Sequence, residues 1–350
     1  MKISKILLEW YKKNARDLPW RTETIPYRTW ISEIILQQTR VEQGLAYYHR
    51  FMKAFPDVEA LASADEEEVL RQWQGLGYYS RARNMHSTAK QIVHAYGGEF
   101  PRSSAELRAL KGIGPYTAAA MASIAFGEPV AAIDGNVIRV VSRLFAVAQP
   151  VNKAEGKKLL EQLAGEILDR ESPGDFNQAM MELGALICTP RNPDCMNCPL
   201  NHNCQALESG SPAAFPVKEK KNRTIEMWLC YFHLVCGEFT ILKRRTEPGI
   251  WQGLYDFPLL EADRPISDEE LISFANSHFV IVPGSKAVLS ENGRVRHQLS
   301  HRTLHIHFYT LEIPELPATL PPGWKVTGVD ELHSTPFPVV IANYINKVYG

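Results

Sequence analysis

The sequence predicts two domains, an all-α domain followed by a smaller α+β domain. A chain of 350 residues with 45% hydrophobic content is long enough to bury two cores. Through residues 1–204 apolar side chains recur three and four positions apart, which is the period of helices packed on one face. After residue 223 the pattern changes to β-branched runs and alternation, which is typical of strands. We therefore place the all-α domain at 1–205, a linker rich in Pro, Gly, Ser and charge at 206–223, and the α+β domain at 224–350.

The helical spacing begins with Ile6, Leu7, Trp10 and Tyr11 and returns through residues 27–35. The same criterion predicts further helices at 66–73, 82–96, 104–110, 116–126, 136–145, 153–168 and 175–187. In the second domain, strands are expected at 228–235, 239–242, 280–282 and 305–311.

The charge is almost balanced, with 38 basic and 39 acidic residues and a formal net charge of -1. Taken alone, this balance argues against nucleic acid as the partner. The first 222 residues, however, carry 27 basic and 25 acidic side chains, so the total is compatible with a basic face. The N-terminus has only three consecutive apolar residues, and no stretch approaches 18 of them, so we expect neither a secretion signal nor a membrane span. The expectation is a cytoplasmic, nucleoid-associated monomer.

Four of the six cysteines, Cys188, Cys195, Cys198 and Cys204, fall within 17 positions. In a chain large enough to have its own core, clustered thiols more often hold a metal than form disulfides. Only Cys195 and Cys198 form a C-x2-C knuckle, whereas zinc ribbons usually have two. The spacing alone leaves tetrahedral zinc and an iron-sulfur cluster both open.

This cysteine pattern at the end of a helical domain resembles the [4Fe-4S] loop of the endonuclease III superfamily of DNA glycosylases. The resemblance implies a [4Fe-4S] cluster on the four cysteines and a DNA phosphate contact from Arg191. A second feature is the turn at Gly112 and Gly114, followed by Pro115 at the first position of a helix. Glycine allows positive φ and close approach, so N–H groups at this helix N-terminus can face a phosphate. The turn alone also fits an ordinary helix–helix connection, but together with the cysteines it resembles the superfamily's helix-hairpin-helix element, with Lys111 as an added phosphate contact.

Two carboxylates suit the hydrolysis of an N-glycosidic bond, which needs a protonated acid for the leaving base and an anion for the cationic sugar. Glu33 is the only charged residue in segment 30–39, where burial would raise its pKa and keep it protonated. Asp134 lies between an apolar run and a helix, and as an N-cap it would accept backbone hydrogen bonds that lower its pKa. Considered alone, each residue also has a noncatalytic interpretation: Glu33 could lie on the polar face of a helix, and Asp134 could be only a structural helix cap.

Segments 18–21, 30–39, 75–84, 134–136 and 176–181 resemble the adenine DNA glycosylases within that superfamily. By this resemblance Glu33 protonates adenine and later activates water, and Asp134 stabilises the cationic sugar, directly or through a transient covalent bond. Tyr116 and Asn136 would orient these groups. The resemblance also implies adenine contacts from Trp20, Arg21 and Gln178, and insertion of Gln37, Gln38 and Tyr78 into the duplex when the nucleotide is flipped out.

Tyr116 stands where strand-cleaving members of the superfamily have a lysine nucleophile. A phenol cannot form the Schiff base that precedes strand cleavage. Ile138 similarly stands where some adenine glycosylases have a lysine. We therefore expect a monofunctional glycosylase that leaves an abasic site.

The second domain contains segment 249–258, which is similar to part of the Nudix fold. Residues 223–350 lack the Arg-Glu-x-x-Glu-Glu box that holds Mg²⁺ in pyrophosphate hydrolases, so hydrolysis of free nucleotides is disfavoured. The resemblance is instead to the 8-oxoguanine-recognising domain of adenine glycosylases, with Ser300 and His301 in the contact positions and Leu299 in place of the usual Phe. The spacing of His297 and His301 suggests zinc only weakly, because no carboxylate lies near them in the sequence.

The expected partner is double-stranded DNA that contains adenine opposite 8-oxoguanine or guanine. The sequence disfavours three other functions. A thymine or oxidised-pyrimidine glycosylase is disfavoured by Tyr116 and by the second domain. A noncatalytic iron-sulfur DNA-binding protein is disfavoured by Glu33 and Asp134, and a Nudix hydrolase by the missing acidic box.

Overall fold

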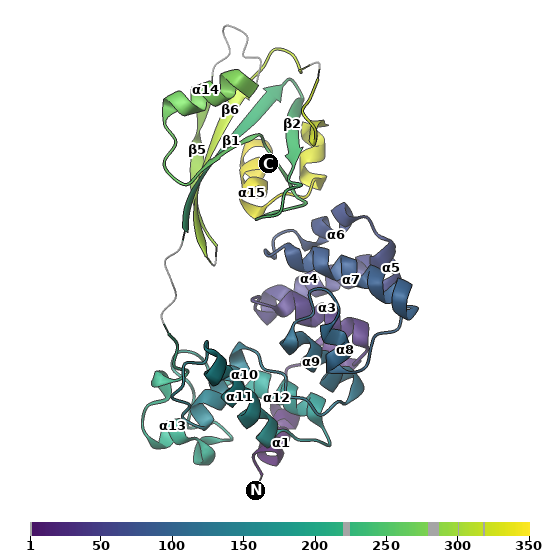
Figure 1. The fold of residues 1–350 in the computed structure, drawn as a ribbon, viewed down its shortest axis with the longest axis vertical. Coiled ribbons are helices and arrows are strands. Elements are labelled where there is room, and N and C mark those ends of the chain that lie inside the picture. Colours follow the sequence, from purple (N-terminus) through teal and green to yellow (C-terminus); the bar gives the residue numbers. More distant parts are fainter. Residues whose placement is uncertain (1, 220–224, 279–286, 300, 318) are drawn as a thin grey trace. The chain divides into compact units, whose positions relative to one another are not determined.

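The computed structural model describes residues 2–219, 225–278, 287–299, 301–317 and 319–350, which form two compact units (Figure 1). The first unit comprises Met1–Ser63 and Asn84–Lys221, and the second comprises Ala64–Arg83 and Asn222–Gly350. Residues 64–83 belong with the second unit through hydrogen bonds from Tyr79 Oη to the Phe337 carbonyl (3.2 Å) and from Tyr255 Oη to Glu67 Oε1 (2.7 Å). Among the described residues, no helix is long and apolar enough to cross a membrane.

The helices predicted from residue 27 onward are present and end within two residues of the predicted boundaries, whereas the helices at Pro19–Thr22, Val41–Ala54, Val58–Ser63 and Gln205–Glu208 were not predicted. The helices before residue 210 are α1 (Ile3–Asn14), α2 (Pro19–Thr22), α3 (Pro26–Leu36), α4 (Val41–Ala54), α5 (Val58–Ser63), α6 (Glu66–Trp73), α7 (Ser80–Tyr96), α8 (Ser104–Arg108), α9 (Pro115–Phe126), α10 (Gly135–Leu144), α11 (Ala154–Ile167), α12 (Pro173–Leu186) and α13 (Gln205–Glu208). α6 lies in the second unit, and α7 runs from the second unit into the first. The predicted helical periodicity is confirmed.

Helix α12 is central to the first unit, because it packs against α1, α9 and α10. Gly184 permits the close approach of α10, since a Cβ atom there would lie 2.6 Å from Cβ of Asn136. Earlier on the same helix, the buried Asn177 side chain accepts a hydrogen bond from the Ala132 N–H (3.0 Å) and donates one to the Val130 carbonyl (2.9 Å). These contacts fix the segment that leads into α10.

Helices α8 and α9 form the predicted hairpin. Gly112 has φ of 78°, and a Cβ atom there would lie 2.6 Å from Cβ of Asn84. Gly114 differs from the expectation of positive φ: it is the N-cap of α9 with φ of -81°, and no atom lies within 4 Å of where its Cβ would be. Pro115 occupies the first turn of α9 as predicted. The hairpin therefore uses Gly112 for its turn and leaves open space beside Gly114.

Replacing Gly112 by Ala is expected to lower the free energy of unfolding by about 1–3 kcal/mol, because the new Cβ clashes with Asn84 and L-residues disfavour this φ. Urea denaturation measures the change. Gly114→Ala is the matched control, with an expected change under about 1 kcal/mol because its φ suits alanine. Equal losses in the two variants would contradict the structural distinction between these glycines.

The second unit contains a mixed sheet. Its strands are β1 (Ile225–Cys236), β2 (Phe239–Arg244), β3 (Tyr255–Asp256), β4 (Leu259–Ala262), β5 (Ala287–Gln298), β6 (Arg302–Glu312) and β7 (Trp324–Gly328). β1 pairs parallel to β6 and antiparallel to β2 and β4, and β5 and β6 form a hairpin. One core lies between the sheet and α15 (Val339–Tyr349), and another between the sheet and α14 (Asp268–His278) (Figure 1). The strand expected at 280–282 lies outside the described residues.

The segment expected to be a linker is held against the first unit as far as Glu219. The Val151 N–H donates a hydrogen bond to the Val217 carbonyl (2.9 Å), and the side chain of Asn152 exchanges hydrogen bonds with the Glu219 backbone. The described part of residues 206–223 is therefore a packed extension of the helical unit.

Candidate active site

The first unit contains a cavity of about 480 Å³, a volume typical of small-ligand sites. It is lined by nine of the residues expected to be catalytic or to contact DNA: Trp20, Arg21, Glu33, Gln37, Gln38, Tyr116, Asp134, Asn136 and Gln178. Most of them lie on α2, α3, α9, α10 and α12. Gln37 and Gln38 directly follow the end of α3, and Asp134 is the N-cap of α10. We call this space the active-site cavity.

Glu33 lies on the buried helix α3 and is only 8% exposed. Tyr116 donates a short hydrogen bond to Glu33 Oε2. The pKa of Glu33 is raised to about 7, chiefly by burial; the hydrogen bond from Tyr116 lowers it, the nearby Asp134 raises it, and the charge of Arg21 lowers it. The expected upward shift is confirmed, and Glu33 can hold a proton near neutral pH.

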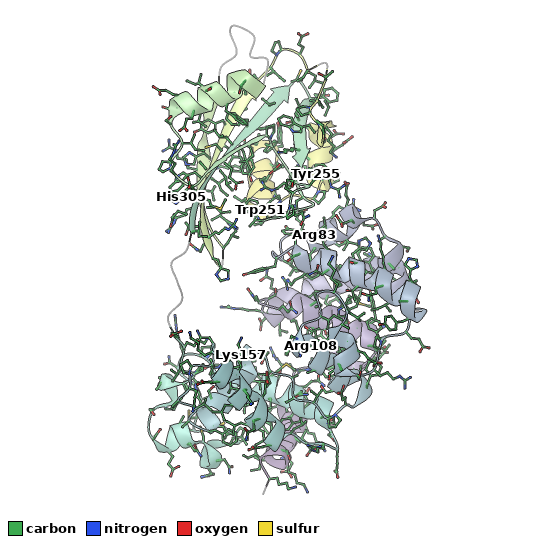
Figure 2. The ribbon with its side chains drawn as sticks, viewed as in Figure 1. Arg83, Arg108, Lys157, Trp251, Tyr255 and His305 are labelled. Carbon is green, nitrogen blue, oxygen red and sulfur yellow. The ribbon has the colours of Figure 1, made fainter. Side chains whose placement is uncertain are left out.

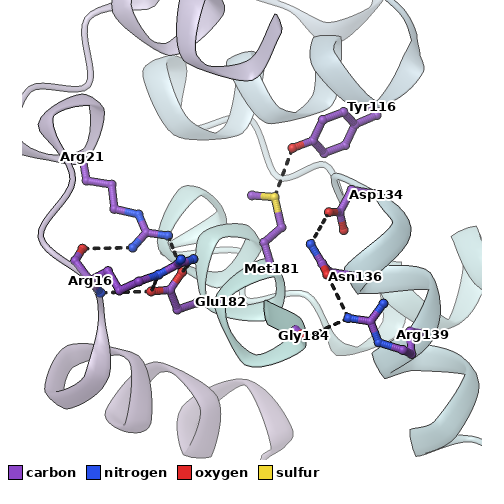
Figure 3. A network of polar contacts seen from close by, with 9 residues as sticks. All are labelled: Arg16, Arg21, Tyr116, Asp134, Asn136, Arg139, Met181, Glu182 and Gly184. Carbon is purple, nitrogen blue, oxygen red and sulfur yellow. Dashed lines mark hydrogen bonds and ion pairs between the residues drawn. The ribbon is translucent and has the colours of Figure 1, made fainter. Parts of the chain in front are cut away.

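Tyr116 stands in the first turn of α9. Burial and the adjacent carboxyls of Glu33 and Asp134 raise its pKa well above the ordinary value, so it stays a neutral phenol. Its hydroxyl also contacts Sδ of Met181 at 3.1 Å (Figure 3). A neutral hydroxyl in this place can orient the Glu33 carboxyl but cannot act as an amine nucleophile.

Asp134 caps helix α10, as expected. Its Oδ1 accepts a hydrogen bond from the Val137 N–H (2.7 Å), and its Oδ2 accepts one from Asn136 Nδ2 (2.8 Å; Figure 3). The expectation that its pKa would be lowered is wrong, because burial raises the pKa more than these hydrogen bonds lower it. The two acids therefore differ in their hydrogen bonding, with donors to both oxygens of Asp134, and not in the direction of their pKa shifts.

Arg139, which the sequence reasoning missed, links Asn136 to the cysteine loop. Its Nη2 donates to Asn136 Oδ1 (2.8 Å) and to the Gly184 carbonyl (2.7 Å; Figure 3), and its Nε donates to the Cys188 carbonyl (2.7 Å). Arg139 could have been predicted, because a residue three positions after Asn136 on the same helix lies beside it on the helix surface. Through Asn136, Arg139 holds Asp134 in place.

Two further residues of the cavity were also missed. Glu182, with a side chain 1% exposed, is within 2.8 Å of both Arg16 and Arg21. It is the only charged residue between Asp175 and Arg191, the same signal that selected Glu33. The cavity thus carries a buried ion cluster in addition to its two acids.

The four clustered cysteines line a second, small cavity of about 30 Å³. Burial raises the pKa of Cys198 to about 11, so its thiolate needs a neighbouring cation. The buried Arg143 donates a hydrogen bond to Cys188 Sγ (3.3 Å) and others to the Thr189 and Pro212 carbonyls (2.8 and 3.0 Å). Four sulfur donors around one internal space, with a fixed guanidinium beside them, fit an iron-sulfur cluster.

The expected phosphate contacts are at the surface of the first unit. Arg191 and Lys111 are exposed, and the Arg191 carbonyl accepts a hydrogen bond from Thr189 Oγ1 (2.8 Å) that shapes the loop. Gly114 has open space beside it at the N-terminus of α9. These positions are accessible to a DNA backbone.

In the second unit, Tyr78 and His301 line a cavity of about 590 Å³ together with Trp251 and Leu299. Tyr78 is 48% exposed and has φ of 48°, a backbone conformation that is rare for a large side chain. Ser300 lies outside the described residues.

His305 lies on strand β6 (Figure 2) and stacks on Trp228, with ring centroids 4.6 Å apart. Its Nε2 is 2.5 Å from Glu226 Oε2. This carboxylate comes from the neighbouring strand β1, a neighbour that the local sequence did not reveal.

Comparison with protein families divides the chain in the same way. Residues 31–166 match the HhH-GPD superfamily of base excision DNA repair proteins, and residues 230–347 match the NUDIX domain. Residues 188–204 match the iron-sulfur binding domain of endonuclease III, so the four cysteines hold a [4Fe-4S] cluster.

Curated relatives are similar over most of the chain. An adenine DNA glycosylase of Mus musculus is 34% identical over 91% of this chain and 72% of its own length, and one of Buchnera aphidicola is 35% identical over 86% and 83%. Among solved structures, a thermostable thymine-DNA glycosylase is 30% identical with a TM-score of 0.54, covering 59% of this chain and 95% of that chain. An endonuclease III–DNA complex is 25% identical with a TM-score of 0.51, covering 59% and 96%. The chain belongs to the adenine DNA glycosylase family, whose members hydrolyse N-glycosidic bonds in base excision repair.

Proposed function

We propose that this protein removes adenine mispaired with 8-oxoguanine or guanine from double-stranded DNA, as a monofunctional glycosylase. The observation that carries the proposal is the pairing, in one cavity, of a carboxyl group protonated near neutral pH, Glu33, with a hydrogen-bonded carboxylate, Asp134. One acid serves the leaving base and the other the developing cation.

The residues around the cavity suggest the order of events. Adenine enters after base flipping, beside Trp20, Arg21 and Gln178. Glu33, oriented by Tyr116, donates its proton to N7 of the base, and the bond between C1′ and N9 breaks with its electron pair going to adenine. Asp134 stabilises the cationic sugar, and water adds at C1′ while the Glu33 carboxylate takes its proton.

Recognition of the opposite base is assigned to the second domain, at 224–350. Support comes from Tyr78 and His301, which line one cavity of the second unit, and from the match to the NUDIX domain without its acidic box. Leu299 can pack against the opposite base but cannot stack on it as Phe does. We therefore expect a weaker preference for 8-oxoguanine over guanine than in relatives that have Phe at this position.

A single-turnover assay tests the proposal on a duplex with adenine opposite 8-oxoguanine. Duplexes with adenine opposite guanine, adenine opposite thymine, and guanine opposite thymine are the comparisons. We expect base loss that alkali converts into strand breaks, fastest opposite 8-oxoguanine and negligible opposite thymine. The chemical reason is that Tyr116 offers no amine for lyase chemistry. Strand breaks without alkali would contradict monofunctional cleavage, and removal of thymine from a G:T duplex with adenine left intact would contradict the substrate.

A further inference from the structure

Arg16, Arg21 and Glu182 form a charged cluster in the wall of the active-site cavity (Figure 3). Oε2 of Glu182 lies 2.8 Å from Nη2 of each arginine, and its Oε1 accepts hydrogen bonds from the backbone N–H (3.0 Å) and Nε (2.8 Å) of Arg16. Nη1 of Arg21 also donates to the Arg16 carbonyl (3.1 Å). Within the part of the chain that the structure describes, the hydrogen bonds to this carboxylate come from Arg16, including its backbone N–H, and from Arg21.

The cluster is costly to bury. The side chains of Glu182, Arg21 and Arg16 are 1%, 15% and 28% exposed, so much of their hydration is lost. A buried ion group adds little net stability on average, and apolar side chains of similar size would often do as well. Its position among the reacting groups suggests a role in the chemistry.

The charges that surround Glu33 come from several elements. Arg21 on α2 lowers the pKa of Glu33, and Asp134 at the start of α10 raises it. Tyr116 on α9 is neutral, and its hydrogen bond lowers that pKa. Glu182 on α12 adds a negative charge beside Arg21. An unpaired guanidinium at this place would favour the ionised form of Glu33, which cannot donate a proton.

Glu182 remains anionic under all ordinary conditions. Burial would raise its pKa, but hydrogen bonds from Arg16 and Arg21 outweigh burial and hold the pKa at about 2. Its negative charge is therefore constant over the pH range in which Glu33 titrates.

We propose that Glu182 is a positioning residue for the general acid: it fixes the Arg21 guanidinium toward the adenine and offsets its charge, so that Glu33 stays protonated beside a cation. The inference deepens the proposed function and rests on it, because it takes Glu33 as the proton donor. It explains why a cavity that must hold a neutral acid also contains a buried arginine.

The test is the pH profile of the single-turnover excision rate, from about pH 5 to pH 9. In the wild type, the rate falls as pH rises through about 7, where Glu33 loses its proton. Glu182→Gln leaves the charge of Arg21 uncompensated and lowers the pKa of Glu33. We expect the midpoint to move toward acid by about half to one unit, so that the rate at alkaline pH falls about three- to tenfold more than the rate on the acid plateau.

Three further variants sharpen the test. Glu182→Asp keeps the charge and should keep the wild-type midpoint even if the rate falls. Arg16→Gln removes a partly exposed cation, leaves Glu182 paired with Arg21, and should move the midpoint toward alkaline pH, which keeps the proposal testable if Glu182→Gln does not fold. Glu23→Gln is the matched control for net charge, since Glu23 forms an exposed ion pair with Arg28 (2.5 Å) outside the cavity lining, and its midpoint should not move.

An equal loss of rate at every pH, with the midpoint unmoved in both Glu182→Gln and Arg16→Gln, would overturn this inference and leave Glu182 a structural residue. Excision by Glu33→Gln, or a wild-type rate without an alkaline limb, would instead overturn the assignment of Glu33 as the acid, and this inference with it. The two failures are therefore distinguishable.

Discussion

Glu33→Gln is expected to abolish base excision while leaving duplex binding intact. Glutamine has nearly the same shape and can still accept the hydrogen bond from Tyr116, but it has no acidic proton to transfer to the base and no carboxylate to activate water. General acid–base catalysis contributes about a hundredfold to ten-thousandfold, and Glu33 serves in both steps, so a loss of at least about a thousandfold is expected. Single-turnover excision measures the rate, and fluorescence anisotropy with a duplex measures binding.

The stability of this variant shows whether the fold is intact. Because the pKa of Glu33 is raised in the folded state, its contribution to stability is complete below the unfolded value and is lost as pH rises through about 7. Glutamine carries no charge, so above pH 7 the variant should be more stable than the wild type, by up to about 3 kcal/mol. A lower melting temperature at pH 8 would mean that Glu33 is structural. Glu42→Gln, on the exposed face of α4, is the matched control and should excise at the wild-type rate.

The helical part of the fold could be predicted because the signal is local. Most of the longer helices of the first unit, α4 excepted, were predicted from the buried face in their own sequence, and Pro115 and Asp134 mark helix starts by their chemistry. The division into compact units could not be predicted in the same way. Residues 64–83 join the second unit through contacts such as that of Tyr79 with Phe337, 258 positions away, which no local pattern records.

The candidate site shows the same limit. A single charge in an apolar helix identified Glu33, and the same criterion applied to α12 would have identified Glu182. The direction of the pKa shift of Asp134 was missed for another reason. Its capping hydrogen bonds are local and readable from the sequence, whereas its desolvation depends on how α12 and the segment fixed by Asn177 enclose it.

Asp134→Asn should separate the two carboxyl groups in function. Asparagine caps a helix about as well as aspartate, so the hydrogen bond from the Val137 N–H and the stability of α10 should survive, with a change in the free energy of unfolding under about 1 kcal/mol. The excision rate should nevertheless fall at least about a hundredfold, because a neutral amide cannot offset the positive charge that develops on the sugar. Thermal unfolding and single-turnover excision measure the two effects.

The residual activity of Asp134→Asn carries the sharper information. Asp134 raises the pKa of Glu33 by its negative charge, so removing that charge should lower this pKa and move the alkaline limb of the rate toward acid. Asp134→Asn, which loses the stabilisation of the sugar cation, should thus keep an excision rate that falls at alkaline pH. Glu33→Gln should lose this pH dependence altogether. Arg139→Gln provides the comparison, since it loosens Asn136 but keeps the carboxylate, and should reduce the rate only about tenfold with the limb in place. If Asp134→Asn left the rate within about threefold of wild type, another group of the cavity would have to stabilise the sugar cation. Apart from Glu33 and Asp134, the one carboxylate among the described residues of the cavity lining is Glu182, and its charge is already paired with two arginines.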